Sequence, residues 1–232
     1  RILDGKKALY KVPLPKKGHT KKAILETYTK EYSAEYQSQA LIDLAKKLKK
    51  KIPNLNQIKK IDIFTSHHTH YVIVTGPNDP QKMDPNASRV TLDHSIMYIF
   101  AVALEDGNWN HIKSYTKARA KRKSTIKIWR SIKTHEDRIW TRKYHDPNPK
   151  KKSFGAKVVI TLKNGKKVIE QQDRADAHPY GSRPFRIQNY INKFLTLTDH
   201  ILAKKESYRF LKTVHHLKTF MSNQLHKLKY QL

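Results

Sequence analysis

Three histidines in the segment "HHTHYVIVTGPNDPQKMDP" are the side chains whose types and spacing first suggest chemistry. If the segment is a strand, two of the imidazoles of His67, His68 and His70 lie two residues apart on one face, a spacing that zinc can use. A third and a fourth ligand are not evident, and the chain has no cysteine, so we expect structural histidines, no metal and no cofactor. The stretch "NDPQKMDPN", with Pro80 and Pro85, is typical of a turn.

The charge of the chain suggests a different chemistry. Lys and Arg number 48 against 19 Asp and Glu, which gives a formal net charge of +29. Such a charge favours a polyanionic partner, because bound phosphates relieve the self-repulsion of the chain and counterions are released from the polyanion. Nucleic acid is therefore the first partner to consider and an anionic membrane the second. Codon bias in an AT-rich genome would also raise the lysine content, but it does not explain the small number of acidic residues.

Three basic runs, "KKLKKK", "KARAKRK" and "PKKK", carry much of this charge. A single run is usually a solvated face, but three runs with Tyr115, Trp129, Trp140 and Tyr144 among them favour RNA, since aromatic rings can stack on bases while Lys and Arg contact phosphates. No signature of an RRM, KH, double-stranded-RNA-binding or zinc-finger domain is present, so we expect binding to the RNA backbone rather than base reading. The residues predicted to contact RNA are Lys46, Lys47, Lys49, Lys50, Lys51, Lys117, Arg119, Lys121, Arg122, Lys123, Lys127, Arg130, Lys150, Lys151 and Lys152.

Helices and strands along the chain must position these groups. Residues 1–27, with Pro13 and Pro15 among lysines, are typical of an extended basic arm. Helical spacing predicts helices at "SAEYQSQALIDLAKKLKKK", with Ser33 as its N-cap, at "IMYIFAVAL", ended by Gly107, and at "KSTIKIWRSI". Two more helices are predicted at "RPFRIQNYINKFLTL" and at "SYRFLKTVHHLKTFMSNQLHKLKY", whose apolar residues form one broad stripe.

Strands are indicated at three places. The stretch "IKKIDIFTS" alternates apolar and polar residues, "RIWTRKYH" resembles a strand, and "AKVVITLKNGKKVIEQ" is typical of a hairpin with Asn164-Gly165 as its turn. Helices mixed with a hairpin sheet predict an α+β domain. No stretch approaches the ~20 apolar residues of a membrane span, so none is expected.

Five segments, "KEYSAEYQSQALIDLA", "HHTHYVIVTGPNDPQKMDP", "LDHSIMYIFAVALEDGNW", "YHDPNPKKKSFGAKVVITLKNGKKV" and "ADAHPYGSRPF", together resemble the 2-methylcitrate dehydratase (MmgE/PrpD) family. The resemblance is collinear from about Tyr28 to about Leu197. That family has a large helical N-terminal domain and a smaller α+β C-terminal domain, and only the second is matched. The resemblance therefore implies helices packed on a mostly antiparallel sheet over residues 28–197, followed by a helical extension over residues 198–232.

The resemblance also implies metal-independent dehydration of 2-methylcitrate in a cleft between the two domains. Lys30 stands at the position of the family's substrate-facing lysine, Tyr98 at that of a tyrosine near the cleft, and His68 in the histidine-rich segment. Gln37 stands where many relatives carry histidine, and a glutamine cannot relay a proton at neutral pH. Relatives are near neutral or acidic over residues 111–152, where this chain is strongly basic. We interpret Lys30, Tyr98 and His68 as relics and expect no catalytic residue.

Charge and resemblance together lead to one hypothesis and its alternatives. The chain is predicted to be a non-catalytic, RNA-binding structural protein, an accessory component of a mitochondrial ribosome derived from a dehydratase domain. The compartment follows from the resemblance, because propionate metabolism in eukaryotes is largely mitochondrial. The alternative is the C-terminal part of an active 2-methylcitrate dehydratase, a hydro-lyase, whose helical half is a separate chain or was not included. A membrane-surface protein is disfavoured, since no helix opposes a lysine face to a Trp-rich apolar face.

Overall fold

A computed structural model describes residues 16, 18, 27–74 and 78–230 of the chain. The expected basic arm over residues 1–27 thus lies outside the described residues, apart from Lys16, Gly18 and Thr27. The described part contains helices packed on a sheet, which confirms the α+β class.

The sheet has four strands in the order β2-β1-β3-β4. These strands are β1 (Ile58–Thr65), β2 (Ile132–Glu136), β3 (Ala156–Leu162) and β4 (Lys167–Gln172). Strand β1 pairs in parallel with β2 and antiparallel with β3, while β3 and β4 form the predicted hairpin around Asn164-Gly165. The sheet is therefore mixed, with two antiparallel pairings and one parallel pairing.

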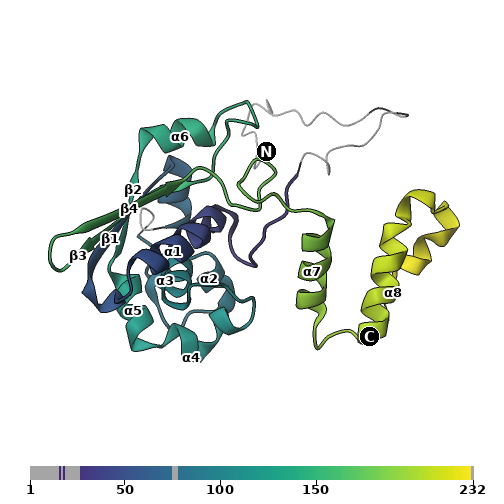
Figure 1. Ribbon diagram of the computed structural model, residues 1–232, viewed down its shortest axis with the longest axis horizontal. Helices are drawn as coiled ribbons and strands as arrows, with labels where there is room; N and C mark the ends of the chain where they lie inside the picture. Colours follow the sequence, from purple (N-terminus) through teal and green to yellow (C-terminus); the bar gives the residue numbers. More distant parts are fainter. Residues whose placement is uncertain (1–15, 17, 19–26, 75–77, 231–232) are drawn as a thin grey trace, which may run out of the picture.

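Three helices form the layer that packs against the sheet (Figure 1). They are α1 (Gln39–Lys51), α3 (Ile96–Asp106) and α5 (Lys123–Arg130). Helix α1 contacts β3 and β4, and α3 contacts both α1 and α5, so α3 is buried from Ile96 to Leu104. Their apolar side chains and the inward residues of β1 and β3 make one core, in which Leu44, Ile61 and Phe100 are fully buried. Burial of such side chains supplies most of the favourable free energy of folding.

The buried helix α3 begins and ends where the sequence predicts. The hydroxyl of Ser95 accepts a hydrogen bond from Tyr98 N at 3.3 Å, which satisfies one free N–H of the first turn. Gly107 follows the last residue with φ +67°, a left-handed conformation that favours glycine. Helix α5 is also confirmed, although the last residue of its predicted stretch, Ile132, belongs to β2.

Two predicted elements differ from the structure. Residues Arg138–Tyr144, expected as a strand, form the helix α6, because the Asp137 carboxylate caps Ile139 N at 2.8 Å and Trp140 turns inward. Ser33 is not the N-cap of α1, which begins six residues later, after a tight turn at Tyr36–Ser38. The Gln39 side chain holds this approach segment by donating to the carbonyls of Tyr32 and Ala34.

Two helices at the end of the described chain stand to one side of the sheet (Figure 1). They are α7 (Ile187–Thr198) and α8 (Lys204–His215), and their closest aromatic contact stacks Phe194 on Phe210 with ring centroids 5.3 Å apart. The prediction of one helix with a single apolar face up to residue 230 is wrong. Helix α8 ends at His215, and only short helical turns follow it. The remaining helical pieces are Leu55–Gln57, Thr69–Ile73, Pro80–Met83, α2 (Arg89–Asp93), Lys113–Tyr115, α4 (Lys117–Ala120), Leu217–Thr219 and Ser222–Leu228.

Candidate functional site

Glu35 is a half-buried acid with a strongly shifted pKa. It lies just before α1, and its carboxylate accepts a hydrogen bond from Gln37 N at 2.6 Å. Burial raises the pKa of Glu35 to about 7, although the backbone N–H groups of Gln37 and Tyr36 and the nearby Lys30 and His94 act in the opposite direction. A carboxyl group with a pKa near neutrality can take up and release protons at physiological pH.

Two lysines, Lys30 and Lys82, interact electrostatically with Glu35. Lys82 is buried, its Nζ donates to the carbonyl of Val72 at 2.8 Å, and burial lowers its pKa while Asp79 and Glu35 oppose the shift. Lys30 is exposed and lowers the pKa of Glu35. The resemblance implies that Lys30 is a substrate-facing lysine. The structure places Lys30 on the same side of the domain as Glu35 and Lys82.

Aromatic side chains continue this surface. Tyr36 meets Phe154 edge to face at 5.1 Å between ring centroids, and Phe154 meets Tyr144 at 5.0 Å. His68 stacks on Tyr144 at 5.3 Å, and Tyr144 also hydrogen-bonds with the side chain of Gln37. Gln37 and His68 therefore both reach this cluster through Tyr144.

Tyr98 lies elsewhere, inside the core. Its ring is fully buried against Trp129 at 5.1 Å, and its hydroxyl donates to the carbonyl of Ser114. Burial raises the pKa of Tyr98 to about 12. The structure therefore does not bring Tyr98 to the surface that carries Glu35 and Lys30, because α3 is buried from Ile96 to Leu104.

The histidine segment forms a helical turn rather than a strand, so the expectation of two imidazoles on one strand face is wrong. His67 pairs with Glu136 at 3.1 Å, and His70 contacts the Thr134 hydroxyl at 2.8 Å. Among the described residues, no group of three or more His, Asp or Glu side chains could hold a metal ion.

The Glu35→Gln variant is expected to remove a pH dependence of folding. In the wild-type protein the unfolded chain loses the Glu35 proton near pH 4.5 and the folded chain near pH 7, so stability falls as the pH rises between these values. Between pH 4.5 and 7, about 1.4 kcal/mol per pH unit corresponds to about 3.5 kcal/mol. Because the Glu35 side chain is only half-buried, solvent screening reduces the expected loss to about 2 to 3 kcal/mol. Urea denaturation of both proteins from pH 4.5 to 8 tests this. Parallel stability curves would contradict the burial of Glu35, whereas the expected curves diverge as the pH rises.

The lysines at the end of α1 divide into two groups. Three of them contact the domain itself, since Lys46 donates to the Tyr32 hydroxyl at 3.1 Å, Lys47 to Gln172 at 2.7 Å, and Lys51 pairs with Glu170. Lys49 and Lys50 form no ion pair with any described acidic residue. Only part of the "KKLKKK" run therefore remains available for an external anion.

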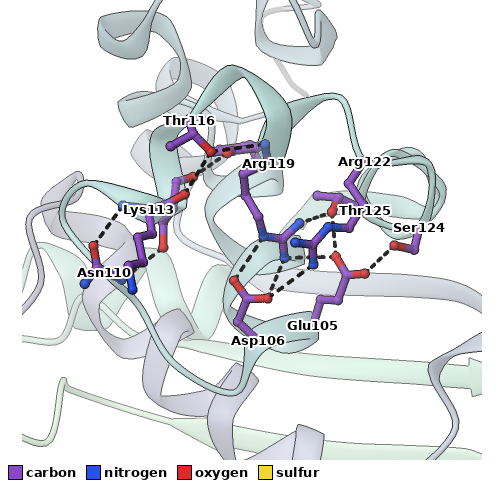
Figure 2. Close-up of polar contacts among 11 residues, drawn as sticks. Glu105, Asp106, Asn110, Lys113, Thr116, Arg119, Arg122, Ser124 and Thr125 are labelled. Atoms are coloured by element: carbon purple, nitrogen blue, oxygen red, sulfur yellow. Dashed lines mark hydrogen bonds and ion pairs between the residues drawn. The ribbon is translucent and has the colours of Figure 1, made fainter.

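Arg119 is the clearest departure from the predicted RNA-contacting set. Its side chain is 6% exposed, because it lies in an internal ion-pair cluster between α3 and α5 (Figure 2). The guanidinium contacts Asp106 through Nε at 3.0 Å and through Nη2 at 2.9 Å, and Glu105 through Nη2 at 2.9 Å. The hydroxyl of Thr125 completes its surroundings. Arg119 is a structural residue of the domain, since its donors are already occupied.

The other predicted contacts stay at or near the surface. Arg122 is 52% exposed and lies 3.8 Å from Asp106. In the loop after α6, the carbonyls of Lys150 and Lys152 accept hydrogen bonds from Arg174, which fixes the loop without using the lysine side chains. The remaining exposed members are Lys117, Lys121, Lys123, Lys127, Arg130, Lys150 and Lys151.

The model of the MmgE/PrpD C-terminal domain matches residues 32–219 of this chain. The chain belongs to the MmgE/PrpD family. The MmgE/PrpD match covers the sheet, the helical layer on it, and the helices α7 and α8. No helix among the described residues is both long and apolar enough to span a membrane.

Sequence reasoning missed Glu35 and Lys82. Both stand in segments that carry the MmgE/PrpD resemblance, Glu35 in "SAEYQ" and Lys82 in "NDPQK", but each was interpreted only as part of a motif or a turn. A signal was present for Glu35, an ionisable residue beside apolar positions of a predicted helix, whereas the predicted turn gave none for Lys82. Only the tertiary structure brings the two into one electrostatic neighbourhood.

Proposed function

We propose that this MmgE/PrpD domain is a non-catalytic, RNA-associated structural protein of a large ribonucleoprotein particle. The observation that carries the proposal is the net charge of +29, together with basic runs whose side chains are largely exposed and have few acidic partners. Counterion release makes such a surface bind nucleic acid backbone with little regard to sequence.

A mitochondrial ribosome is the particle that we propose. The parent chemistry, propionate breakdown, is largely mitochondrial in eukaryotes, and ribosomal RNA offers a large phosphate-rich surface to a basic domain. Helices α7 and α8 present exposed apolar side chains, among them Ile187, Tyr208 and Val214, that suit contacts with neighbouring proteins. The acid–base cluster around Glu35 is then a relic of the parent fold.

The chain is expected to co-sediment with ribosome-sized particles and to leave them after RNase treatment. Purified chain should also bind structured RNA with an affinity that falls steeply as salt rises, because each neutralised phosphate adds about 0.7 to 0.9 to the slope of log K against log salt. Sedimentation of native extract with and without RNase, followed by salt titration of the purified chain, tests this. A small RNase-resistant complex would contradict the proposal.

A hydro-lyase half is the second candidate function, favoured by the pKa of Glu35 near 7 with Lys30 and Lys82 beside it. In that case Glu35 or its neighbours would face the helical domain of an MmgE/PrpD enzyme across a cleft. Turnover of 2-methylcitrate by the native complex, abolished by Glu35→Gln, would support it. Absence of turnover in a complex that contains RNA would favour the structural role.

A further inference from the structure

A groove with a volume of about 660 Å³ opens where the end of α1, the start of β1 and helix α5 meet. Four cationic side chains from these three elements line it: Lys49, Lys59, Lys127 and Arg130. Lys59, Lys127 and Arg130 are exposed and Lys49 is half-buried. No described acidic side chain lies within ion-pair distance of any of them. The groove therefore gathers positive charge that the domain itself does not neutralise.

The one acidic residue in the lining, Glu105, is already satisfied from within the domain. Its carboxylate contacts Arg119 at 2.9 Å and accepts hydrogen bonds from Ser124 and, at 2.5 Å, from Thr125 (Figure 2). Burial alone would raise the pKa of Glu105, but the two hydroxyls and the Arg119 guanidinium hold it below its usual value. Arg119 thus acts as a positioning residue, since it offsets the acid beneath the groove and ties α5 to the end of α3.

The other residues that line the groove suit a ligand with apolar and hydrogen-bonding groups as well as negative charge. Leu55 and Ile128 supply apolar surface, and Asn54 and Asn56 supply side-chain amides at the other wall. The carboxamide oxygen of Asn54 accepts from Asn56 N at 3.0 Å, which leaves its nitrogen as a donor. Amide donors and lysines suit phosphate and ribose oxygens, while apolar surface suits the sugar edges.

We propose that this groove binds the phosphodiester backbone of RNA, with Lys49, Lys59, Lys127 and Arg130 contacting successive phosphates. The assignment rests on the proposed RNA-associated function and specifies where that function is carried out. A single small anion would leave most of a 660 Å³ groove empty and most of its charges unpaired. A nucleic-acid backbone carries several phosphates in a row, so it can pair with cations that come from three separate elements.

The test compares two variants with equal loss of charge. The groove variant carries Lys49→Gln, Lys59→Gln, Lys127→Gln and Arg130→Gln. The control carries Lys204→Gln, Lys205→Gln, Lys212→Gln and Lys218→Gln, four exposed lysines on and after α8, away from the groove (Figure 1). A salt titration of binding to a structured RNA is measured for the full chain and for both variants, with melting temperatures to show that each is folded.

Loss of four phosphate contacts should reduce the slope of log K against log salt by about 3, whereas the control should change it by less than about 1. Affinity at fixed salt should fall at least about tenfold further in the groove variant. The milder Lys127→Gln, Arg130→Gln pair, confined to the surface of α5, should give about half of the slope change and replaces the groove variant if that variant is unfolded.

Equal losses in both variants would overturn the groove while leaving RNA binding intact. Displacement of RNA by millimolar ATP or inorganic phosphate, with the slope unchanged in the groove variant, would instead assign the groove to a small anion and also overturn the proposal. Failure of the unmodified chain to bind RNA in any salt would refute the proposed function itself.

Discussion

The Arg119→Ala variant is expected to lose about 3 kcal/mol of unfolding free energy, because it leaves the largely enclosed Glu105 carboxylate without its cation. The Glu105 side chain is 14% exposed and the Arg119 side chain 6%, so water replaces the lost contacts poorly. The expected result is a large shift of the urea midpoint with an unchanged slope of unfolding free energy against urea. Circular dichroism at neutral pH during urea titration measures it.

Arg122 offers the matched control, since it pairs with the same Asp106 from the surface at 3.8 Å and is 52% exposed. Arg122→Ala should cost less than about 1 kcal/mol, as expected for a solvated ion pair. Adding Glu105→Gln to Arg119→Ala should recover part of the loss, because the uncompensated buried charge is then removed. Similar losses in the Arg119 and Arg122 variants would show that the cluster between α3 and α5 is not an internal one.

The Gly155→Ala variant is expected to destabilise the fold by about 3 kcal/mol through overpacking. A Cβ at this position, immediately before β3, would lie 1.9 Å from the backbone oxygen of Gln172 and 2.6 Å from that of Asp173. These are backbone atoms of the partner strand and its end, so no side-chain rotation can relieve the contact. The strands must separate at the point where Phe154 enters the aromatic cluster beside Gln37. Thermal unfolding monitored by circular dichroism provides the measurement.

Gly165→Ala is the control, in the turn of the same hairpin. Gly165 has φ +85° and no atom within 4 Å of an added Cβ, so the cost should be only the left-handed strain of about 1 to 2 kcal/mol. A Gly155→Ala variant as stable as Gly165→Ala would mean that β3 and β4 do not approach each other as closely as described.

The sequence predicts those helices and strands whose residue pattern is decided by neighbouring residues alone. The apolar run of α3 with its glycine stop, and the Asn164-Gly165 turn of the hairpin, need no tertiary information. Helix α6 could not be predicted in the same way, since seven residues show too little periodicity to separate helix from strand. Its cap, Asp137, was a usable signal that the alternation of the following residues obscured.

The sequence shows which residues of the candidate sites are charged. It does not show which of these side chains are free to contact another molecule. Arg119 belongs to a basic run, yet its partners lie one helix earlier, and a linear pattern does not show which arginine of a run turns inward. Lys51 pairs with Glu170 of β4, which lies 119 positions further along the chain. The shifted pKa values of Glu35 and Lys82 likewise depend on burial by segments distant in the chain.

The pairing of β1 has a consequence for how the chain reaches its fold. The β3–β4 hairpin closes over a short turn, whereas β1 must find β2 and β3 far along the chain, with Ile61 meeting both Ile132 and Ile160. Closing such loops costs more chain entropy, so we expect the hairpin to form first and β1 to pair with its neighbours later. Until then its "IDIF" segment is open to strands of other molecules. We expect the net charge of +29 to keep such incompletely folded copies apart by electrostatic repulsion.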